Sequence, residues 1–228
     1  MTGIAPPNFI LASFLSGYPG EGFSENVALL LQDDGIILTE ADRQWVAQLI
    51  ADKQQVEDLC SEYIDLFERG RHVNPLNETE YGRNRALAKG NDLADIAGFY
   101  RAFGFSLDDD RGYKETFDHL AVELEFYALL GIKENYLVEA NDVAGIEIVR
   151  DARKKFLDSH LGRFIQSICE RPGVQDSERY LRIYRWCAEL VRQECQLLGV
   201  SPKQVSYLGD QTGSEEMNCG GTACETPN

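Results

Sequence analysis

The stretch "KETFDHLAVELEFYALL", residues 114–130, combines residue types that can move protons. Histidine changes its charge near neutral pH, and a neighbouring carboxylate can orient its ring. In a helix that begins at Asp118, His119 and Glu123 are four positions apart and lie on one face. One interpretation is therefore an acid–base enzyme that uses Asp118, His119 and Glu123 on a small substrate. The other is that these side chains belong to a surface that holds a partner.

The same residues also have purely structural interpretations. Asp118 stands immediately before a strongly apolar run, where an N-cap is expected to accept a backbone N–H. We expect one carboxylate oxygen of Asp118 to cap the helix and the other to point outward, where it could meet a cationic partner. His119 is expected to be held by Glu123 and to offer a ring nitrogen to that partner.

The elements that position these residues are helical, because apolar residues recur at three- and four-residue steps almost throughout. "TEAD" at residues 39–42 resembles a capping box, and Ser24 is a candidate N-cap. No period-two alternation is long enough for a sheet, so we predict an all-α fold in one compact domain. The predicted helices cover residues 9–16, 24–32, 39–69, 92–105, 118–137, 143–169 and 177–198.

The division predicted along the chain is a helical domain at residues 1–205 and a flexible, cysteine-containing tail at residues 206–228. The tail is rich in Gly, Thr and Glu and lacks apolar periodicity. It contains Cys219 and Cys224 in a C-x4-C arrangement, which supplies two of the four ligands of a zinc site. Nothing nearby completes the set, so no metal is expected.

The charge restricts the partners. The chain has 38 acidic and 22 basic residues and a formal net charge of -16. This balance argues against nucleic acid, whose phosphates would be repelled, and favours basic partners. No secretory signal and no run of about 18 apolar residues is present, so we expect a cytoplasmic protein without membrane insertion.

Common enzyme signatures are missing from the sequence. There is no GxxxxGK[ST] phosphate loop, no GxGxxG, no HExxH and no GxSxG. Only three histidines are present, His72, His119 and His160, and no Glu-x-x-His pair occurs. These absences argue against the common helical metalloenzymes, and we predict no cofactor.

Four separated segments resemble the TorD family of redox-enzyme maturation chaperones. They are "YIDLFERGRHVNPLNETEYG", "NDLADIAGFYRAFGF", "DHLAVELEFYALL" and "ARKKFLDSHLGRF", and they occur in the family's order. The resemblance is greatest to the branch that serves enzymes of the type II dimethyl sulfoxide reductase group. One departure is Phe117, which stands where the family often has proline before Asp-His.

The resemblance implies a non-catalytic, all-helical chaperone. Such a protein binds the N-terminal leader, commonly a twin-arginine leader, and the apo form of a molybdenum enzyme's catalytic subunit. It holds that subunit until the molybdopterin cofactor is inserted, before export or assembly. A nucleotide-responsive role has been suggested for the family, but no phosphate loop supports it here. A monomer and a dimer that swaps helices through the loop at residues 108–114 both remain open.

The resemblance also implies which residues contact the leader peptide. Glu123 is added because of its spacing from His119, and plain core packing remains the alternative for the aromatic and leucine positions. The predicted peptide-binding residues are Tyr63, Leu66, Phe67, Glu80, Tyr81, Asp118, His119 and Glu123.

We expect the purified protein to hold no stoichiometric metal, because Cys219 and Cys224 form an incomplete ligand set. Elemental analysis of the purified protein tests this, with a Cys219→Ser, Cys224→Ser double variant as the control. One equivalent of metal that disappears in the double variant would contradict the prediction.

Overall fold

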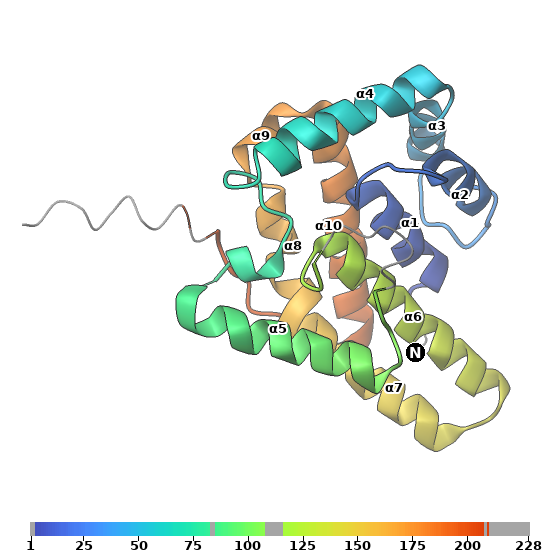
Figure 1. Ribbon diagram of the computed structural model, residues 1–228. Coiled ribbons are helices and arrows are strands. Elements are labelled where there is room, and N and C mark those ends of the chain that lie inside the picture. Colours follow the sequence, from blue (N-terminus) through green and yellow to red (C-terminus); the bar gives the residue numbers. More distant parts are fainter. Residues whose placement is uncertain (1–2, 83–84, 108–115, 208, 210–228) are drawn as a thin grey trace, which may run out of the picture.

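Helices form nearly all of the regular structure of the chain (Figure 1). The computed structural model describes residues 3–82, 85–107, 116–207 and 209. Within these ranges, extended pairing is limited to two isolated bridges, so the predicted all-α fold is confirmed. The elements are α1 (Pro6–Ser16), α2 (Phe23–Leu30), α3 (Glu40–Leu49), α4 (Lys53–Tyr63), the π-helix η1 (Ile64–Arg69), the 3-10 helix η2 (Glu78–Glu80), α5 (Arg85–Ala102), α6 (Leu120–Glu139), α7 (Val143–Phe156), the π-helix η4 (Leu157–Leu161), α8 (Gly162–Ile168), α9 (Pro172–Asp176) and α10 (Glu178–Leu198).

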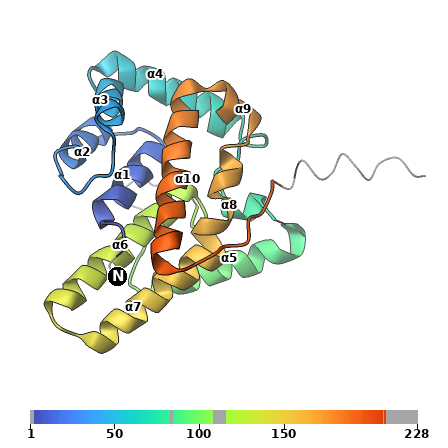
Figure 2. The ribbon, with the colours of Figure 1, turned by 180° about the vertical axis from the view of Figure 1, so that it is seen from behind.

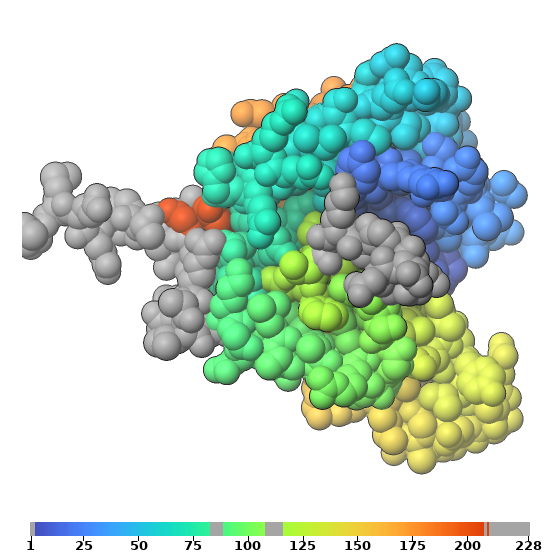
Figure 3. Space-filling model, viewed as in Figure 1, coloured from blue at the N-terminus to red at the C-terminus, as the bar shows by residue number. Residues whose placement is uncertain are grey.

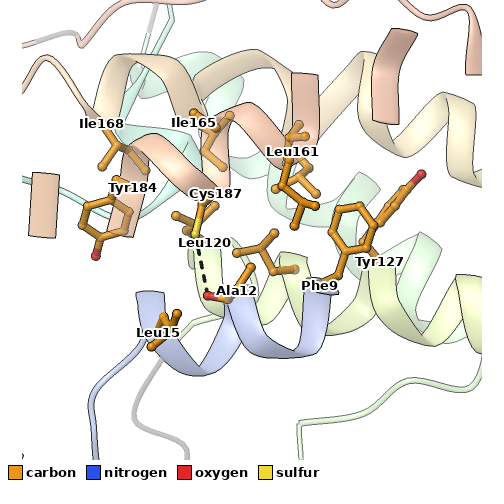
Figure 4. Packing of buried hydrophobic residues seen from close by; sticks show 14 of the residues in the cluster. Phe9, Ala12, Leu15, Leu120, Tyr127, Leu161, Ile165, Ile168, Tyr184 and Cys187 are labelled. Carbon is orange, nitrogen blue, oxygen red and sulfur yellow. Dashed lines mark hydrogen bonds between the residues drawn. The ribbon is translucent and has the colours of Figure 1, made fainter. Parts of the chain in front are cut away.

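Helix α1 is the centre of the core. It lies against both α6 and α10, as the two opposite views show (Figures 1 and 2). Its side chains Phe9, Leu11, Ala12 and Leu15 are all buried. The ring of Phe9 packs edge-on against Tyr127 of α6, with 4.7 Å between the centroids (Figure 4). A short helix that is apolar over most of its circumference is stable only when other helices surround and cover it.

Local capping explains several helix starts. Thr39 accepts a hydrogen bond from the N–H of Asp42, as the capping-box sequence predicts, and Ser177 accepts one from the N–H of Tyr180. The expectation for Ser24 was wrong. Helix α2 begins at Phe23, and its N-cap is Gly22 with a φ of 75°, so Ser24 lies inside the first turn. A backbone at that φ favours glycine, which has no Cβ.

The predicted helix across residues 39–69 is interrupted. Asp52 accepts a hydrogen bond from the N–H of Gln55 and so starts α4 as a new helix after α3. Aspartate competes for backbone donors in this way and favours helix starts over helix interiors. After Tyr63 the chain continues as η1, and it stops at Gly70 as predicted.

The predicted stretch at residues 143–169 is continuous but changes its winding. Helix α7 passes into η4 and then into α8. A π-helical turn inserts extra backbone and alters which side chains face inward, and such turns are frequent at functional sites. Here the turn buries His160. No helix in the described ranges is long and apolar enough to cross a lipid bilayer.

The chain continues to pack beyond α10 as far as Tyr207. The N–H of Gly82 donates to the carbonyl of Ser206 at 2.8 Å, and Tyr207 pairs with Tyr81 in an isolated bridge. The Tyr207 side chain is buried, and the guanidinium of Arg171 lies 4.2 Å from its ring centroid. The rest of the predicted tail, with Cys219 and Cys224, and the loop at residues 108–114 lie outside the described residues.

A chain that ends at Gly209 is expected to keep its helical content and cooperative melting, because it retains Tyr207. A chain that ends at Ser206 loses this buried ring and is expected to be less stable by about 2–3 kcal/mol. Circular dichroism and urea unfolding of the two truncations beside the full chain measure the difference. A large loss already in the chain that ends at Gly209 would show that residues after 209 contribute to the core.

Candidate functional site

The start of α6 is covered by a segment from the middle of the chain, residues 76–81, hereafter the 76–81 segment. Asn77 and His119 form an isolated antiparallel bridge. The N–H of Glu78 donates to the carbonyl of Asp118 at 2.8 Å, and the N–H of Leu120 donates to the carbonyl of Leu76 at 2.9 Å. The 76–81 segment is therefore fixed to the Asp-His pair by backbone hydrogen bonds.

Asp118 fastens this arrangement with its side chain. Its Oδ1 accepts from Oγ1 of Thr116 at 2.6 Å and from Nδ2 of Asn77 at 3.0 Å. Its Oδ2 accepts from Oγ1 of Thr79 at 2.6 Å and from the Thr79 N–H at 3.4 Å. Burial alone would raise the pKa of Asp118, but the hydrogen bonds from Thr116, Thr79 and Asn77 outweigh it and hold the pKa below its ordinary value.

Two expectations for Asp118 were therefore wrong. It is not the N-cap of α6, because His119 occupies that position. It also does not present a free oxygen outward, because both oxygens accept hydrogen bonds from the chain itself and the residue is only 3% exposed. Two threonines and an asparagine beside one buried carboxylate give Asp118 better partners than the first turn of the helix would supply.

His119 caps α6 with its ring. Its Nδ1 accepts from the N–H of Ala121 at 3.2 Å, so the ring proton is on Nε2, which lies 3.3 Å from the hydroxyl of Tyr63. Burial lowers the pKa of His119 to about 4, so the ring is neutral near pH 7. Both ring nitrogens are thus engaged within the chain.

Glu123 does not orient His119 as expected. Its backbone N–H donates to the carbonyl of His119, but its carboxylate makes no hydrogen bond to the ring, which bonds Tyr63 instead. Glu123 is completely buried, and neither of its oxygens has a hydrogen-bond partner among the described residues. Burial raises its pKa well above the usual value, and the charges of Glu78 and Asp118 raise it further.

The predicted aromatic contacts lie next to His119. Tyr63 at the end of α4 packs against Phe67 of η1, with 5.1 Å between ring centroids, and both rings approach Tyr180 of α10. Tyr63 and Phe67 are buried, whereas Leu66 is half-buried. Core packing therefore accounts for Tyr63 and Phe67 in this conformation.

Glu80 and Tyr81 hold the other end of the 76–81 segment. Glu80 accepts a hydrogen bond from Nζ of Lys89 in α5 at 3.2 Å. The hydroxyl of Tyr81 donates to the carbonyl of Pro75 at 2.7 Å, and its ring lies 5.6 Å from Phe164 of α8. The structure thus places the eight predicted residues on the end of α4, η1, the 76–81 segment and the start of α6, but it buries all of them except Leu66.

Sequence reasoning missed two exposed rings that border these residues. Tyr18 is 40% exposed, and its centroid lies 5.6 Å from that of Tyr63. Phe117 is 43% exposed and immediately precedes Asp118. In Figure 3 cyan residues of α4 and η1, blue residues before α2 and yellow-green residues around the start of α6 are all visible on one face. The only sequence feature that could have indicated these exposed rings was the apolar Phe117 at a position where a proline was expected.

A second missed group lies beneath this face. Glu78 of η2 bonds Nδ1 of His160 at 3.0 Å, and Nε2 of His160 lies 3.2 Å from Oδ2 of Asp95 in α5. Burial alone would lower the pKa of His160, but Glu78 and Asp95 outweigh it and raise the pKa. No sequence pattern links residues so far apart. The only hint was that His160 is one of three histidines.

The protonation and hydrogen bonding of Asp118, His119 and Glu123 do not suit acid–base catalysis. Asp118 is fully hydrogen-bonded, His119 is neutral with both nitrogens engaged, and Glu123 is sealed from solvent. In the part of the chain that the structure describes, no group of three or more His, Cys, Asp or Glu residues could hold a metal ion. A pocket of about 490 Å³ between α3 and α10 is lined by Trp45 and Trp186 among others, but by none of the predicted residues.

Replacement of Asp118 by Asn is expected to lower the free energy of unfolding by about 1.5–3 kcal/mol at pH 7, because an amide cannot accept from all four donors and carries no charge. The pKa of Asp118 is lowered on folding, so its stabilisation is present above the unfolded pKa of about 3.9 and is lost as pH falls through the folded value. The difference between wild type and Asp118→Asn should therefore shrink below about pH 4.

Urea unfolding at pH 7 and at low pH measures both effects. Asp151→Asn is the matched control, because Asp151 is exposed and pairs only with Lys155 in the next turn. Its replacement should change stability by less than about 0.5 kcal/mol. Equal stability of wild type and Asp118→Asn at pH 7 would show that the carboxylate charge does not hold the 76–81 segment.

Comparisons with known proteins also argue against an acid–base enzyme. Residues 37–170 match the family model described as nitrate reductase delta subunit. The selenate reductase assembly chaperone protein of Thauera selenatis is 34% identical over 154 residues, which are 67% of this chain and 76% of that protein. The chlorate reductase assembly chaperone protein of Ideonella dechloratans is 31% identical over 150 residues, or 65% of this chain and 74% of that protein. The chain therefore belongs to the TorD-like nitrate reductase delta subunit family, and it is an assembly chaperone, not an acid–base enzyme.

Proposed function

We propose that this chaperone binds the N-terminal leader and the apo form of a molybdopterin-dependent catalytic subunit in the cytoplasm. It holds this client for cofactor insertion before export or assembly. The observation that carries the proposal is the match to two relatives named as assembly chaperones of selenate reductase and chlorate reductase. It supports a reductase of the same group as the client.

The proposed leader-binding face is the one that surrounds the Asp-His pair. Seven of the eight predicted residues are buried, so their role is to shape this face, and the exposed contacts come from its border. Tyr18 and Phe117 offer aromatic rings, and Leu66 offers a half-buried aliphatic side chain. Such a surface complements the apolar middle of a leader peptide.

The charge of the same face complements the basic start of a leader. Burial raises the pKa of Tyr18, and Cys60 and the negative charge of the exposed Glu68 raise it further. An arginine that stacks on an exposed tyrosine beside a carboxylate gains both cation–π and ionic attraction. With a net charge of -16, the whole chain also attracts a cationic peptide over longer distances.

Replacement of Phe117 by Ser is expected to weaken binding of a synthetic leader peptide about tenfold, because the peptide loses an exposed aromatic contact. Calorimetric titration at two salt concentrations measures the affinity. Binding should weaken at high salt, and a peptide with its arginines replaced by glutamine should bind weakly with little salt dependence.

Tyr136→Ser is the matched control, because Tyr136 is 70% exposed near the other end of α6. It should leave the affinity unchanged. Unchanged affinity in Phe117→Ser would show that the leader does not bind at this face. Absence of any binding to wild type would mean that the client is held through another segment.

A further inference from the structure

Glu123 is in an unusual position for a carboxylate. It is 0% exposed, and its two oxygens are the only buried side-chain polar atoms without a hydrogen-bond partner among the described residues. An ionised carboxylate in such a place would carry a desolvation cost of several kcal/mol with nothing to offset it. Glu123 must therefore either carry a proton or share one.

The ionisable groups that act on Glu123 by charge are acidic. Glu78 of η2 and Asp118 before α6 act on it by charge, and Tyr100 of α5 lies close enough to be affected by all three carboxyl groups. Tyr100 donates its hydroxyl proton to the carbonyl of Phe117 at 2.8 Å, so it is not a donor to Glu123. His119 is neutral and already bonded to Tyr63 and Ala121.

The neighbouring carboxylates differ in what stabilises their charge. Asp118 accepts from three side chains and a backbone N–H, and Glu78 is bonded by His160, which in turn contacts Asp95. Glu123 has no such donor. When like charges share a buried site, the proton goes to the member whose anion is least stabilised. Here that member is Glu123.

We propose that Glu123 and Glu78 hold one proton between them, with the carboxylic acid of Glu123 donating to the carboxylate of Glu78, and that this bond fastens the 76–81 segment onto α6. The bond explains why both oxygens of Glu123 lack an ordinary donor, since its natural partner is another acceptor. It adds a side-chain tie at η2 to the ties that Asn77 and Thr79 make to Asp118. Glu123 is thus a positioning residue for the segment.

The pH dependence follows from the direction of the shift. The folded pKa of Glu123 is raised, so its contribution is fully present below the unfolded value of about 4.3 and is lost as pH rises through the folded pKa. Loss of the proton to solvent leaves two facing carboxylates in a buried site. Repulsion then loosens the 76–81 segment, with up to about a tenfold increase in its opening equilibrium for each pH unit between the unfolded and the folded pKa.

Glu123→Gln tests the proposal, because a glutamine amide has the same shape, can donate to Glu78 and cannot ionise. Infrared spectra of wild type at neutral pH should contain the carbonyl band of a buried carboxylic acid, and this band should be missing in Glu123→Gln. Amide hydrogen exchange at residues 76–81, corrected for intrinsic base catalysis, should accelerate in wild type as pH rises from the unfolded pKa of about 4.3 toward the folded pKa of Glu123, and not in the variant. Glu139→Gln, an exposed position at the end of α6, is the matched control and should behave like wild type.

Glu78→Gln provides a second, independent variant. It removes the negative charge that faces Glu123, so an ionised Glu123 meets an amide that can donate to it and not a second carboxylate. The pH-dependent loosening of residues 76–81 should therefore shrink. Identical infrared spectra and identical exchange profiles in wild type and Glu123→Gln would overturn the proposal, and so would an unchanged profile in Glu78→Gln. None of these measurements uses a leader peptide, so the result is independent of the proposed leader-binding face.

Discussion

A single buried negative charge determines how the central part of this protein is arranged. Asp118 is ionised and almost inaccessible to solvent, so its charge requires hydrogen-bond donors from the chain. Two of them, Asn77 and Thr79, come from a segment about forty residues earlier in the sequence. The 76–81 segment therefore has to cross the start of α6, where it places Glu78 above Glu123 and leaves the N-cap position to His119.

The Asp-His pair consequently acts on its surroundings and not on a substrate. Asp118 fixes the 76–81 segment, and His119 fixes Tyr63 at the junction of α4 and η1. The rings that remain accessible, Tyr18 and Phe117, belong to the loops on either side. The proposed binding and later release of a leader peptide would benefit from this division. The buried residues keep the surface in shape, while the exposed residues would supply contacts of modest strength.

Much of the fold could be predicted from the sequence because the signals are local. Apolar residues at helical spacing located α6, α7 and α10, and Thr39 marked the start of α3 by residue type alone. The errors in the predicted N-caps arose where either of two neighbouring residues could occupy the N-cap position. Gly22 replaced Ser24 at one N-cap and His119 replaced Asp118 at another, because the backbone angle or a better set of partners decided between them. The contact of Glu78 with His160 joins residues 82 positions apart, and no local pattern encodes it. For the same reason the resemblance to a family suggested the residues of the candidate site but not the protonation of Glu123.

The central position of α1 has a consequence for how the protein itself is made. The N–H of Ile4 bonds Glu194 of α10 at 2.7 Å, and α1 is buried between α6 and α10, so its partners lie more than one hundred residues later in the chain. At about 5–20 residues synthesised per second, the apolar surface of α1 lacks α10 for on the order of ten seconds or more. Contacts at such sequence separation also close slowly. An assembly chaperone thus passes through an interval on the ribosome in which its own first helix lacks the cover that α6 and α10 later provide.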